Sequence, residues 1–440
     1  LNKKATLELY SAADVASNAA AMSYRDGLQA EQAAVIARIE QDVLSGEKLD
    51  VVWNMTLAAN IISANIQFGQ MEDIAAIRGV KDVFLENQYE ALQSPRAEAD
   101  PMMSTSSSMI GSNNAWAAGY TGAGTRIAII DTGLDTNHQS FNNGAYLYAL
   151  QRNAEEKGMS VDEYIASLDL LTKADIDAVL KDLNVYEFVE HLTGTAKGTY
   201  YINEKVPFAI NYVDSNYDVT HDNDDKSDHG SHVAGIAAAN RFIPTADGSY
   251  ANAMTDVRMQ GVAPDAQIIV MKVFGANGGA YQDDLMAAIE DALLLDVDVI
   301  NMSLGASSGF SSEDPELDAI YGRVEYFDTI LTISAGNETQ SSYGNMWGTD
   351  QNPTSHPDSA VVSSPSTWGG ALSIASADNS HVLTTYMTVG DDIYAYYDAL
   401  GLYTTFRSLA GEEIEYVMIP GLGEASDFEG LDLEGKIAVI

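Results

Sequence analysis

Three residues that can take part in catalysis stand where apolar runs give way to small residues. Asp131 lies in the segment IIDTG, His229 opens the segment HGSHVAG, and Asn337 ends the segment SAGN. In open parallel sheets, ligands and catalytic groups gather just beyond the carboxyl ends of the strands, which is the position that IIDTG gives to Asp131. A histidine at the start of a helix can project into a cleft. An asparagine amide at the end of a strand can donate a hydrogen bond to a developing oxyanion, which contributes about 2.7–4 kcal/mol in acyl transfer.

Each of these motifs has another interpretation when it is taken alone. Asp-Thr-Gly after apolar residues is also the signature of aspartic proteases, but their two facing carboxylates need a second such triplet, and the sequence has none. His229 and His232 could bind zinc, yet helical zinc hydrolases space two histidines four residues apart around a glutamate that is absent here. Asp131 could also cap a helix or a turn. The order of the motifs along the chain therefore carries more information than any one of them.

The elements that must position these residues follow an α/β pattern from about residue 110. Short apolar runs predict five strands, at 126–130, 267–273, 297–304, 329–334 and 372–376. Two helical segments lie between them, at 231–240 and 283–295. Continuous apolar runs that alternate with helices are typical of a parallel sheet buried on both faces. A polar, partly helical stretch at 141–218 is interpreted as an insertion near the rim of the site, where it could act as a lid.

Residues 1–93 predict a separate, small α+β domain. Apolar residues at helical spacing indicate a helix over 28–43, and a shorter helical segment follows at 71–77. Runs rich in β-branched residues predict strands at 49–55, 60–68 and 80–85, which gives a ferredoxin-like order of elements. Residues 94–109, with two prolines and a serine-rich cluster, are expected to be an exposed linker. Residues 380–440 consist of short β-like runs.

The composition excludes several classes of function. The chain has 440 residues, 64 acidic and 22 basic, and a formal net charge of −42, so it should repel phosphate backbones and anionic lipids. No apolar run approaches the ~18 residues that span a bilayer. There is no cysteine, which excludes a thiol nucleophile and a disulfide framework. We therefore expect neither a nucleic-acid partner nor a membrane span in this portion.

The motifs occur in the order that characterises the subtilisin-like serine proteases, and the chain resembles this family from about residue 110 to 377. That order is Asp-Thr-Gly, His-Gly-x-His-Val-Ala-Gly, a Ser-Leu-Gly strand and Ser-Ala-Gly-Asn. The segment GVAP at 261–264, with the strand after it, is similar as well. The resemblance implies a subtilisin-like α/β catalytic domain over 110–379, with a parallel sheet and helices on both of its faces.

The resemblance extends to both ends of the chain. Residues 1–93 resemble the family's inhibitory propeptide, so this domain is expected to be an intramolecular inhibitor of its own protease. Residues 380–440 look like the start of a β-rich protease-associated domain, an insertion typical of the lactocepin-like proteases of the bacterial cell envelope. The resemblance therefore implies a bacterial protein that is secreted or associated with the cell envelope, with proteins or peptides as substrates.

The resemblance assigns a role to each candidate residue. Asp131 would orient and electrostatically support His229, which would act first as general base and then as acid to the leaving amine. Asn337 would donate to the oxyanion. Two rims would hold the substrate backbone in an extended conformation. They consist of Ser303, Leu304 and Gly305 on one side, and of Ser334, Ala335 and Gly336 on the other.

The nucleophile of the family is absent from the sequence. The family places its serine in a Gly-Thr-Ser-Met-Ala-x-Pro block, and no such block lies between Asn337 and Ile440. Ser363, Ser364 and Ser366 lack the flanking residues, so none of them is nominated. Where the family carries a protease-associated insertion, the serine follows it, so we expect the sequence to stop before the serine and this chain alone to be inactive. The alternative is a pseudoprotease that keeps the peptide groove and acts as a peptide-binding or inhibitory protein.

No cofactor is expected to be required, and no metal ligand is assigned. The acidic residues between 218 and 228 fail the spacing of an EF-hand, because Lys226 replaces a ligand and no glycine follows it. We interpret them as a solvated acidic loop. Calcium at an unassigned position is compatible with the resemblance, since many members of the family use it.

Overall fold

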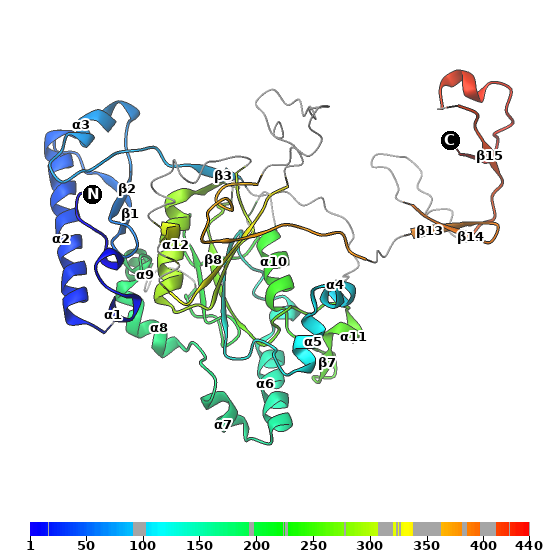
Figure 1. The fold of residues 1–440 in the computed structure, drawn as a ribbon, viewed down its shortest axis with the longest axis horizontal. Helices are drawn as coiled ribbons and strands as arrows, with labels where there is room; N and C mark the ends of the chain where they lie inside the picture. The colour runs from blue at the N-terminus through cyan, green and yellow to red at the C-terminus, as the bar shows by residue number, and fades with distance from the viewer. Residues whose placement is uncertain are drawn as a thin grey trace. The chain divides into compact units, whose positions relative to one another are not determined.

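Six parallel strands form the central sheet of the computed structural model, in the order β12-β11-β10-β4-β8-β5 (Figure 1). The structure describes residues 1–15, 17–90, 103–192, 198–222, 224, 228–276, 279–306, 320–322, 324, 327–337, 362–380, 385–396, 411–421 and 423–439. They divide into two compact units, Leu1–Ser380 and His381–Ile440, and the sheet lies in the first.

The sheet contains the five strands expected from the sequence and one more. The expected strands are β4 (Arg126–Asp131), β8 (Gln267–Lys272), β10 (Val299–Met302), β11 (Ile330–Ser334) and β12 (Leu372–Ile374). The two expected helices are α10 (His229–Ala238) and α12 (Gln282–Leu294). The sixth strand, β5 (Phe208–Asn211), is buried along its whole length and lies inside the insertion predicted at 141–218. That prediction is wrong at its end, because residues 208–211 pair with β8 in the central sheet.

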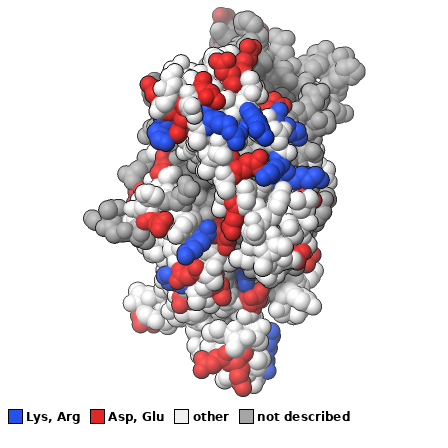
Figure 2. Space-filling model, turned by 90° about the vertical axis from the view of Figure 1, so that its left-hand side faces the viewer, with Lys and Arg blue, Asp and Glu red and all other residues white. Residues whose placement is uncertain are grey.

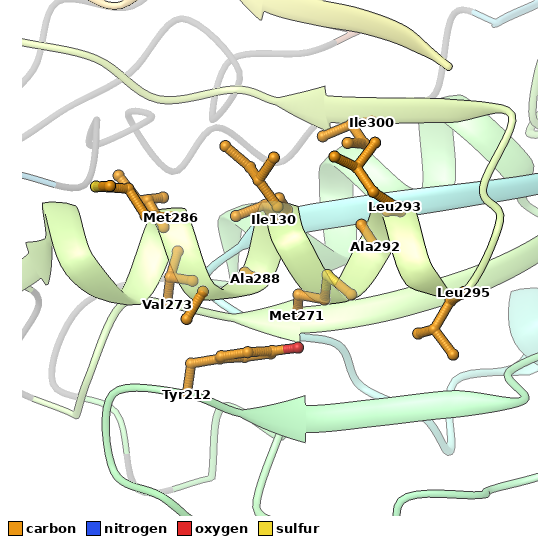
Figure 3. Packing of buried hydrophobic residues seen from close by; sticks show 14 of the residues in the cluster. Ile130, Tyr212, Met271, Val273, Met286, Ala288, Ala292, Leu293, Leu295 and Ile300 are labelled. Carbon is orange, nitrogen blue, oxygen red and sulfur yellow. The ribbon is translucent and has the colours of Figure 1, made fainter. Parts of the chain in front are cut away.

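Helices cover both faces of the sheet because successive side chains of a strand point to opposite faces. Ile127 and Ile129 of β4 belong to the apolar cluster that includes residues of α10. Ala128 and Ile130 belong to the cluster that includes most of the buried residues of α12. Figure 3 shows this second cluster, in which side chains of α12 pack among those of the strands. The sheet is therefore a rigid, doubly covered layer whose carboxyl edge can hold side chains in fixed positions.

Residues 1–90 form a long helix packed on a two-stranded sheet. The helix is α2 (Ala19–Asp42), and β1 (Asp50–Met55) pairs antiparallel with β2 (Ile61–Asn65). The strand expected at 80–85 is not formed, so the ferredoxin-like set of strands is not completed among the described residues. Val80 and Val83 instead pack against the apolar cluster that includes Val35 and Ile39 of α2, whereas Phe84 and Leu85 of the same segment are exposed. Figure 2 shows Lys and Arg interspersed with Asp and Glu on the face that carries this domain.

Shorter elements complete the first unit. The helices are α1 (Ala12–Val15), α3 (Met71–Ala75), α4 (Met103–Ile110), α5 (Ser112–Ala117), α6 (Asn143–Lys157), α7 (Val161–Ala166), α8 (Lys173–Val179), α9 (Tyr186–Leu192) and α11 (Ala253–Asp256), and the strands β6 (Phe242–Pro244) and β7 (Tyr250–Asn252) form a small antiparallel pair. The linker predicted over 94–109 is therefore helical from Met103 onward. It is helical because α4 packs against α5, where Ser112 Oγ donates to Ser107 O at 3.2 Å. Residues 94–102 of the predicted linker lie outside the described residues.

The second unit contains two small sheets. β13 (Thr385–Val389) and β14 (Asp392–Tyr396) form an antiparallel hairpin, and β15 (Tyr416–Met418) pairs in parallel with β16 (Ile437–Val439). Its described residues contain no α-helix, which agrees with the short β-like runs of the sequence. Across both units, no helix in the described part of the chain combines the length and the apolar character that a membrane crossing requires.

Candidate active site

Asp131 and His229 meet at the carboxyl end of β4. Asp131 is the last residue of β4 and His229 is the first residue of α10, and their side chains are 1% and 14% exposed. Nδ1 of His229 lies 2.8 Å from Oδ1 of Asp131. A carboxylate at this distance holds the ring proton on Nδ1, which makes Nε2 the nitrogen that can accept a proton. The pair therefore has the geometry of a general base with its orienting carboxylate.

Opposing effects act on the pKa of His229. Burial is the largest of them and lowers the pKa, because it disfavours the charged ring. The hydrogen bond and the charge of Asp131, with a smaller effect of the charge of Asp228, raise it. The sum places the pKa of His229 above its ordinary value. Asp131 therefore stabilises the imidazolium that forms when His229 takes up a proton.

Two glycines allow the backbone to pack closely around the end of β4. Gly133 has a φ of +110°, and a Cβ atom there would lie 2.3 Å from the carbonyl oxygen of Val219, which accepts a hydrogen bond from Leu134 N at 2.7 Å. A Cβ atom at Gly230 would lie 2.3 Å from the carbonyl oxygen of Gly133 and 3.2 Å from Oδ1 of Asp131. A side chain at Gly230 would push the start of α10 away from the end of β4, whereas one at Gly133 would clash with the backbone of Val219.

Consecutive residues of α10 bond to the segment that follows β4. Gly230 N donates to Oγ1 of Thr132 at 2.8 Å, and Oγ of Ser231 accepts from Asp135 N at 2.7 Å. Because His229 also contacts Asp131, three consecutive residues of the helix are hydrogen-bonded to residues 131–135. The helix start is therefore held in one position relative to the strand end.

The predicted substrate-binding residues lie at the carboxyl ends of β10 and β11, the next two strands beyond β4. They are Ser303, Leu304 and Gly305, which follow β10, and Ser334, Ala335 and Gly336 at the end of β11. Oγ of Ser334 donates to the carbonyl oxygen of Leu304 at 3.3 Å. The two predicted rims are therefore neighbours that one hydrogen bond joins.

Asn337 lies three residues after the end of β11, and it is exposed. The backbone turns just before it, where Gly336 has a φ of +101°. One strand, β10, separates β11 from β4, so with strands about 4.8 Å apart the ends of β11 and β4 are about 10 Å apart. The amide of Asn337 thus lies on the same edge of the sheet as Asp131.

The three serines that were not nominated are buried. Ser363, Ser364 and Ser366 are 2%, 7% and 3% exposed. Ser363 N donates to the carbonyl oxygen of Ala335 at 2.9 Å, and Ser364 exchanges two backbone hydrogen bonds with Ala306, of 2.8 and 3.1 Å. This segment is therefore bonded to one rim at Ala335 and to Ala306, the residue that follows the other rim.

The sequence gives no clear signal for β9 (Gly279–Tyr281), which lies directly before α12. It pairs antiparallel with β3 (Gln88–Glu90), the last strand of the N-terminal domain, with Tyr89 opposite Ala280. Tyr89 is 2% exposed, and its hydroxyl donates to Oε1 of Gln282 at 3.3 Å. Residues 275–281 are rich in glycine and contain no apolar run, so residue types do not predict a strand there.

Carboxylates of α12 form the second contact with the N-terminal domain. Oε1 of Glu290 accepts from Ala58 N at 2.7 Å, and Trp53 Nε1 donates to Oδ1 of Asp284 at 2.8 Å. Both carboxylates are buried. Burial, followed by the charge of Asp283, raises the pKa of Asp284 to about 7, although the hydrogen bond from Trp53 opposes the shift. This interface therefore contains a carboxyl group that titrates near neutral pH.

The described residues offer no metal site. No group of three or more His, Cys, Asp or Glu side chains among them could hold a metal ion. His232 is exposed, and Nδ1 of His229 faces Asp131, so the zinc hypothesis finds no third ligand in the described chain. Asp131 faces an imidazole and not a second carboxylate, which contradicts the aspartic-protease interpretation.

Comparison with known proteins gives matches over most of the chain. A sequence model for the Subtilase family matches residues 122–407. The "PIII-type proteinase" of Lactococcus lactis subsp. cremoris (strain SK11) is 32% identical over 385 residues, which cover 86% of this chain and 16% of that protein. The "PII-type proteinase" of Lacticaseibacillus paracasei is 31% identical over 442 aligned residues, which cover 97% of this chain and 20% of that protein. The "Minor extracellular protease Vpr" of Bacillus subtilis (strain 168) is 27% identical over 391 residues, which cover 86% of this chain and 36% of that protein.

The chain thus spans between 16% and 36% of the length of these three relatives. Among solved structures, the epidermin leader peptide processing serine protease (EpiP) from Staphylococcus aureus matches with a TM-score of 0.46 and 17% identity. That match covers 80% of this chain and 69% of the other.

Proposed function

The chain belongs to the subtilase family, and we propose that it is the first part of a secreted bacterial serine endopeptidase that hydrolyses peptide bonds in proteins or peptides. The observation that carries the proposal is the 2.8 Å contact between Nδ1 of His229 and Oδ1 of Asp131 at the carboxyl edge of the sheet. The names of the three relatives, each a proteinase or protease, support it.

In the proposed reaction His229 acts through Nε2. It takes the proton of a serine hydroxyl as the serine oxygen forms a bond to the carbonyl carbon of the substrate, and it then gives this proton to the departing amine. Water then attacks the acyl-enzyme. His229 takes a proton from the water as its oxygen bonds to the acyl carbon, and gives this proton to the serine oxygen as the acid product leaves. Asp131 stays ionised, keeps the proton of the neutral ring on Nδ1 and stabilises the imidazolium. These steps use protein groups and water, so we propose that the reaction needs no cofactor.

We assign the remaining candidate residues to substrate and oxyanion. The amide of Asn337 would donate to the oxygen that becomes negatively charged, an effect of about 2.7–4 kcal/mol where such donors have been removed. Its exposure at the carboxyl edge of the sheet supports this role. The two rims would hold the substrate backbone, namely Ser303, Leu304 and Gly305 together with Ser334, Ala335 and Gly336.

We place the nucleophilic serine beyond residue 440. The family's serine block is absent from the sequence after Asn337, and the nearby serines at 363, 364 and 366 are buried. The 440 residues alone would then bind a substrate backbone without forming an acyl-enzyme.

We further propose that residues 1–93 inhibit the protease intramolecularly. The pairing of β3 with β9 supports this, because a strand that occupies a sheet edge excludes another peptide from the same edge. The hydrogen bonds from the N-terminal domain to Glu290 and Asp284 of α12 provide a second point of attachment. We also propose that the protein is secreted or associated with the cell envelope; the name of one relative, an extracellular protease, supports secretion.

A serine-directed fluorophosphonate probe tests the proposal. The coding DNA is sequenced past residue 440, and both the 440-residue chain and the longer product are exposed to the probe. We expect a Gly-Thr-Ser-type block in the added sequence, one labelled serine within that block and no label in residues 1–440. Stoichiometric labelling of a serine within residues 1–440 would contradict the position that we assign to the nucleophile. A longer product that binds peptides but takes up no label would instead support the pseudoprotease alternative.

A further inference from the structure

Behind the Asp131–His229 pair lies a second set of polar side chains, contributed by β8, by the loop before α10 and by α10 itself. Lys272 ends β8 and pairs with Asp131 in the register of the sheet. Its side chain is 2% exposed. Its Nζ donates to the carbonyl oxygen of Thr132 at 2.7 Å and to Oδ2 of Asp224 at 2.5 Å. A buried ammonium group thus joins the turn after Asp131 to the loop that leads into α10.

His221 extends this set to the helix. Its Nδ1 lies 3.6 Å from Oδ2 of Asp224, and its Nε2 lies 2.8 Å from Oγ of Ser231. The nearby carboxylate favours the proton on Nδ1, so Nε2 accepts the hydroxyl proton of Ser231. The oxygen of Ser231 is then oriented to accept from Asp135 N, which lies 2.7 Å away in the segment after Asp131.

We infer that His221 is a positioning residue for the Asp131–His229 pair: it fixes the hydroxyl of Ser231, and Ser231 fixes the first turn of α10 against the segment that follows Asp131. The inference rests on the proposed function, in which the distance between the carboxylate and the imidazole sets the basicity of His229. His221 touches neither substrate nor the reacting atoms, and it acts through Ser231 alone.

The charges around His221 keep its ring in the form that this role requires. The groups that face it are the ammonium of Lys272 from β8, the carboxylates of Asp224 and Asp228 from the loop, and the hydroxyl of Ser231 from α10. Burial and then the charge of Lys272 lower the pKa of His221, although the two aspartates oppose the shift. The ring is therefore neutral at neutral pH. Protonation would turn Nε2 into a donor and remove the acceptor for the hydroxyl of Ser231.

Nuclear magnetic resonance of the full 440-residue chain with isotope-labelled histidine tests the inference. Two readouts are followed: the pKa of His229, and the exchange rate of its Nδ1 proton with water. The variants are His221→Leu, which removes the acceptor, and His221→Gln, whose side-chain oxygen can replace Nε2 as acceptor without titrating. Ser231→Ala removes the other partner. His232→Leu, an exposed histidine of the same helix, is the matched control.

We expect His221→Leu and Ser231→Ala to lower the pKa of His229 by about one pH unit, because the effect of a charged partner falls as the partner moves away. The Nδ1 proton should exchange faster in both, while His221→Gln and His232→Leu should match the unmodified chain. The same pKa and exchange rate in all five proteins would overturn the inference, and so would a His221→Gln variant that behaves like His221→Leu. If His221→Leu does not fold, the comparison of Ser231→Ala with His221→Gln decides. Because these readouts need no proteolysis, failure of the positioning role is distinguishable from failure of the proposed function.

Discussion

Substitution of Gly230 by alanine should separate the two proposed catalytic residues. The new Cβ atom would start 2.3 Å from the carbonyl oxygen of Gly133, and contacts under 3.0 Å are essentially never observed, so the helix start must retreat by about 0.7 Å. The distance between His229 and Asp131 would then grow from 2.8 Å to about 3.5 Å, the limit of a hydrogen bond. Overpacking of this kind costs about 1–3 kcal/mol of stability. The pKa of His229 should fall, because the hydrogen bond and charge of Asp131 raise it.

The assay combines thermal unfolding with titration of His229 by its proton resonances. Gly27→Ala is the matched control, because Gly27 also lies within a helix, α2, and a Cβ atom there would meet nothing within 4 Å. Alanine should stabilise that position by about 0.5–1 kcal/mol. Gly230→Ala should destabilise the chain, with each kcal/mol worth about 2–4 °C in the unfolding midpoint. A Gly230→Ala chain with an unchanged midpoint and an unchanged pKa of His229 would refute this account of the close approach.

Three further predictions concern the interface, the core and the proposed chemistry. Because burial and the charge of Asp283 raise the pKa of Asp284 to about 7, the folded interface favours the neutral carboxyl group, and this contribution to stability is lost as the pH rises from about 4 to about 7. Hydrogen exchange at Ala58 should therefore show weaker protection at pH 8 than at pH 5 after correction for intrinsic rates, with a smaller difference in Asp284→Asn; equal pH dependence in both would contradict it. Ile130→Ala should lower the free energy of unfolding of the first unit by about 2–5 kcal/mol in denaturant titration, because Ile130 is fully buried, and a loss below about 1 kcal/mol would argue against the packing described. Asp131→Asn in the longer product should reduce kcat by about 10⁴-fold without loss of fold, since the ring proton would no longer be held on Nδ1; a change of less than tenfold would exclude the role of Asp131.

The framework of the catalytic domain follows from the sequence because its signals are strong and local. Buried parallel strands need continuous apolar runs, so β4, β8 and β10 could be located from residue types alone. Membership of the subtilase family followed from the order of four short motifs, and the family match confirms it. The contact between Asp131 and His229 joins residues 98 positions apart, and the motif order is what predicts that they meet.

The features that the sequence did not predict depend on partners far along the chain. β5 and β9 each form because a strand far along the chain, β8 or β3, provides their hydrogen-bond partners. The segment 80–85 has the composition of a strand but forms none; Val80 and Val83 pack against the apolar cluster beside α2, and Phe84 and Leu85 are exposed. The contacts of His221 with Ser231, and of Lys272 with the turn after Asp131, arise only when three elements come together.

The most direct test of the central claim is hydrolysis of a fluorescently labelled, unstructured protein by the longer product, measured as kcat/KM. His229→Ala is compared with His232→Ala, which removes an exposed histidine three residues along the same helix. The account predicts that His229→Ala lowers kcat/KM by about 10⁴-fold or more, whereas His232→Ala stays within a few-fold of the unmodified enzyme. A His229→Ala protein that hydrolyses the substrate at the unmodified rate would contradict the assignment of Asp131 and His229 as the base and its orienting carboxylate.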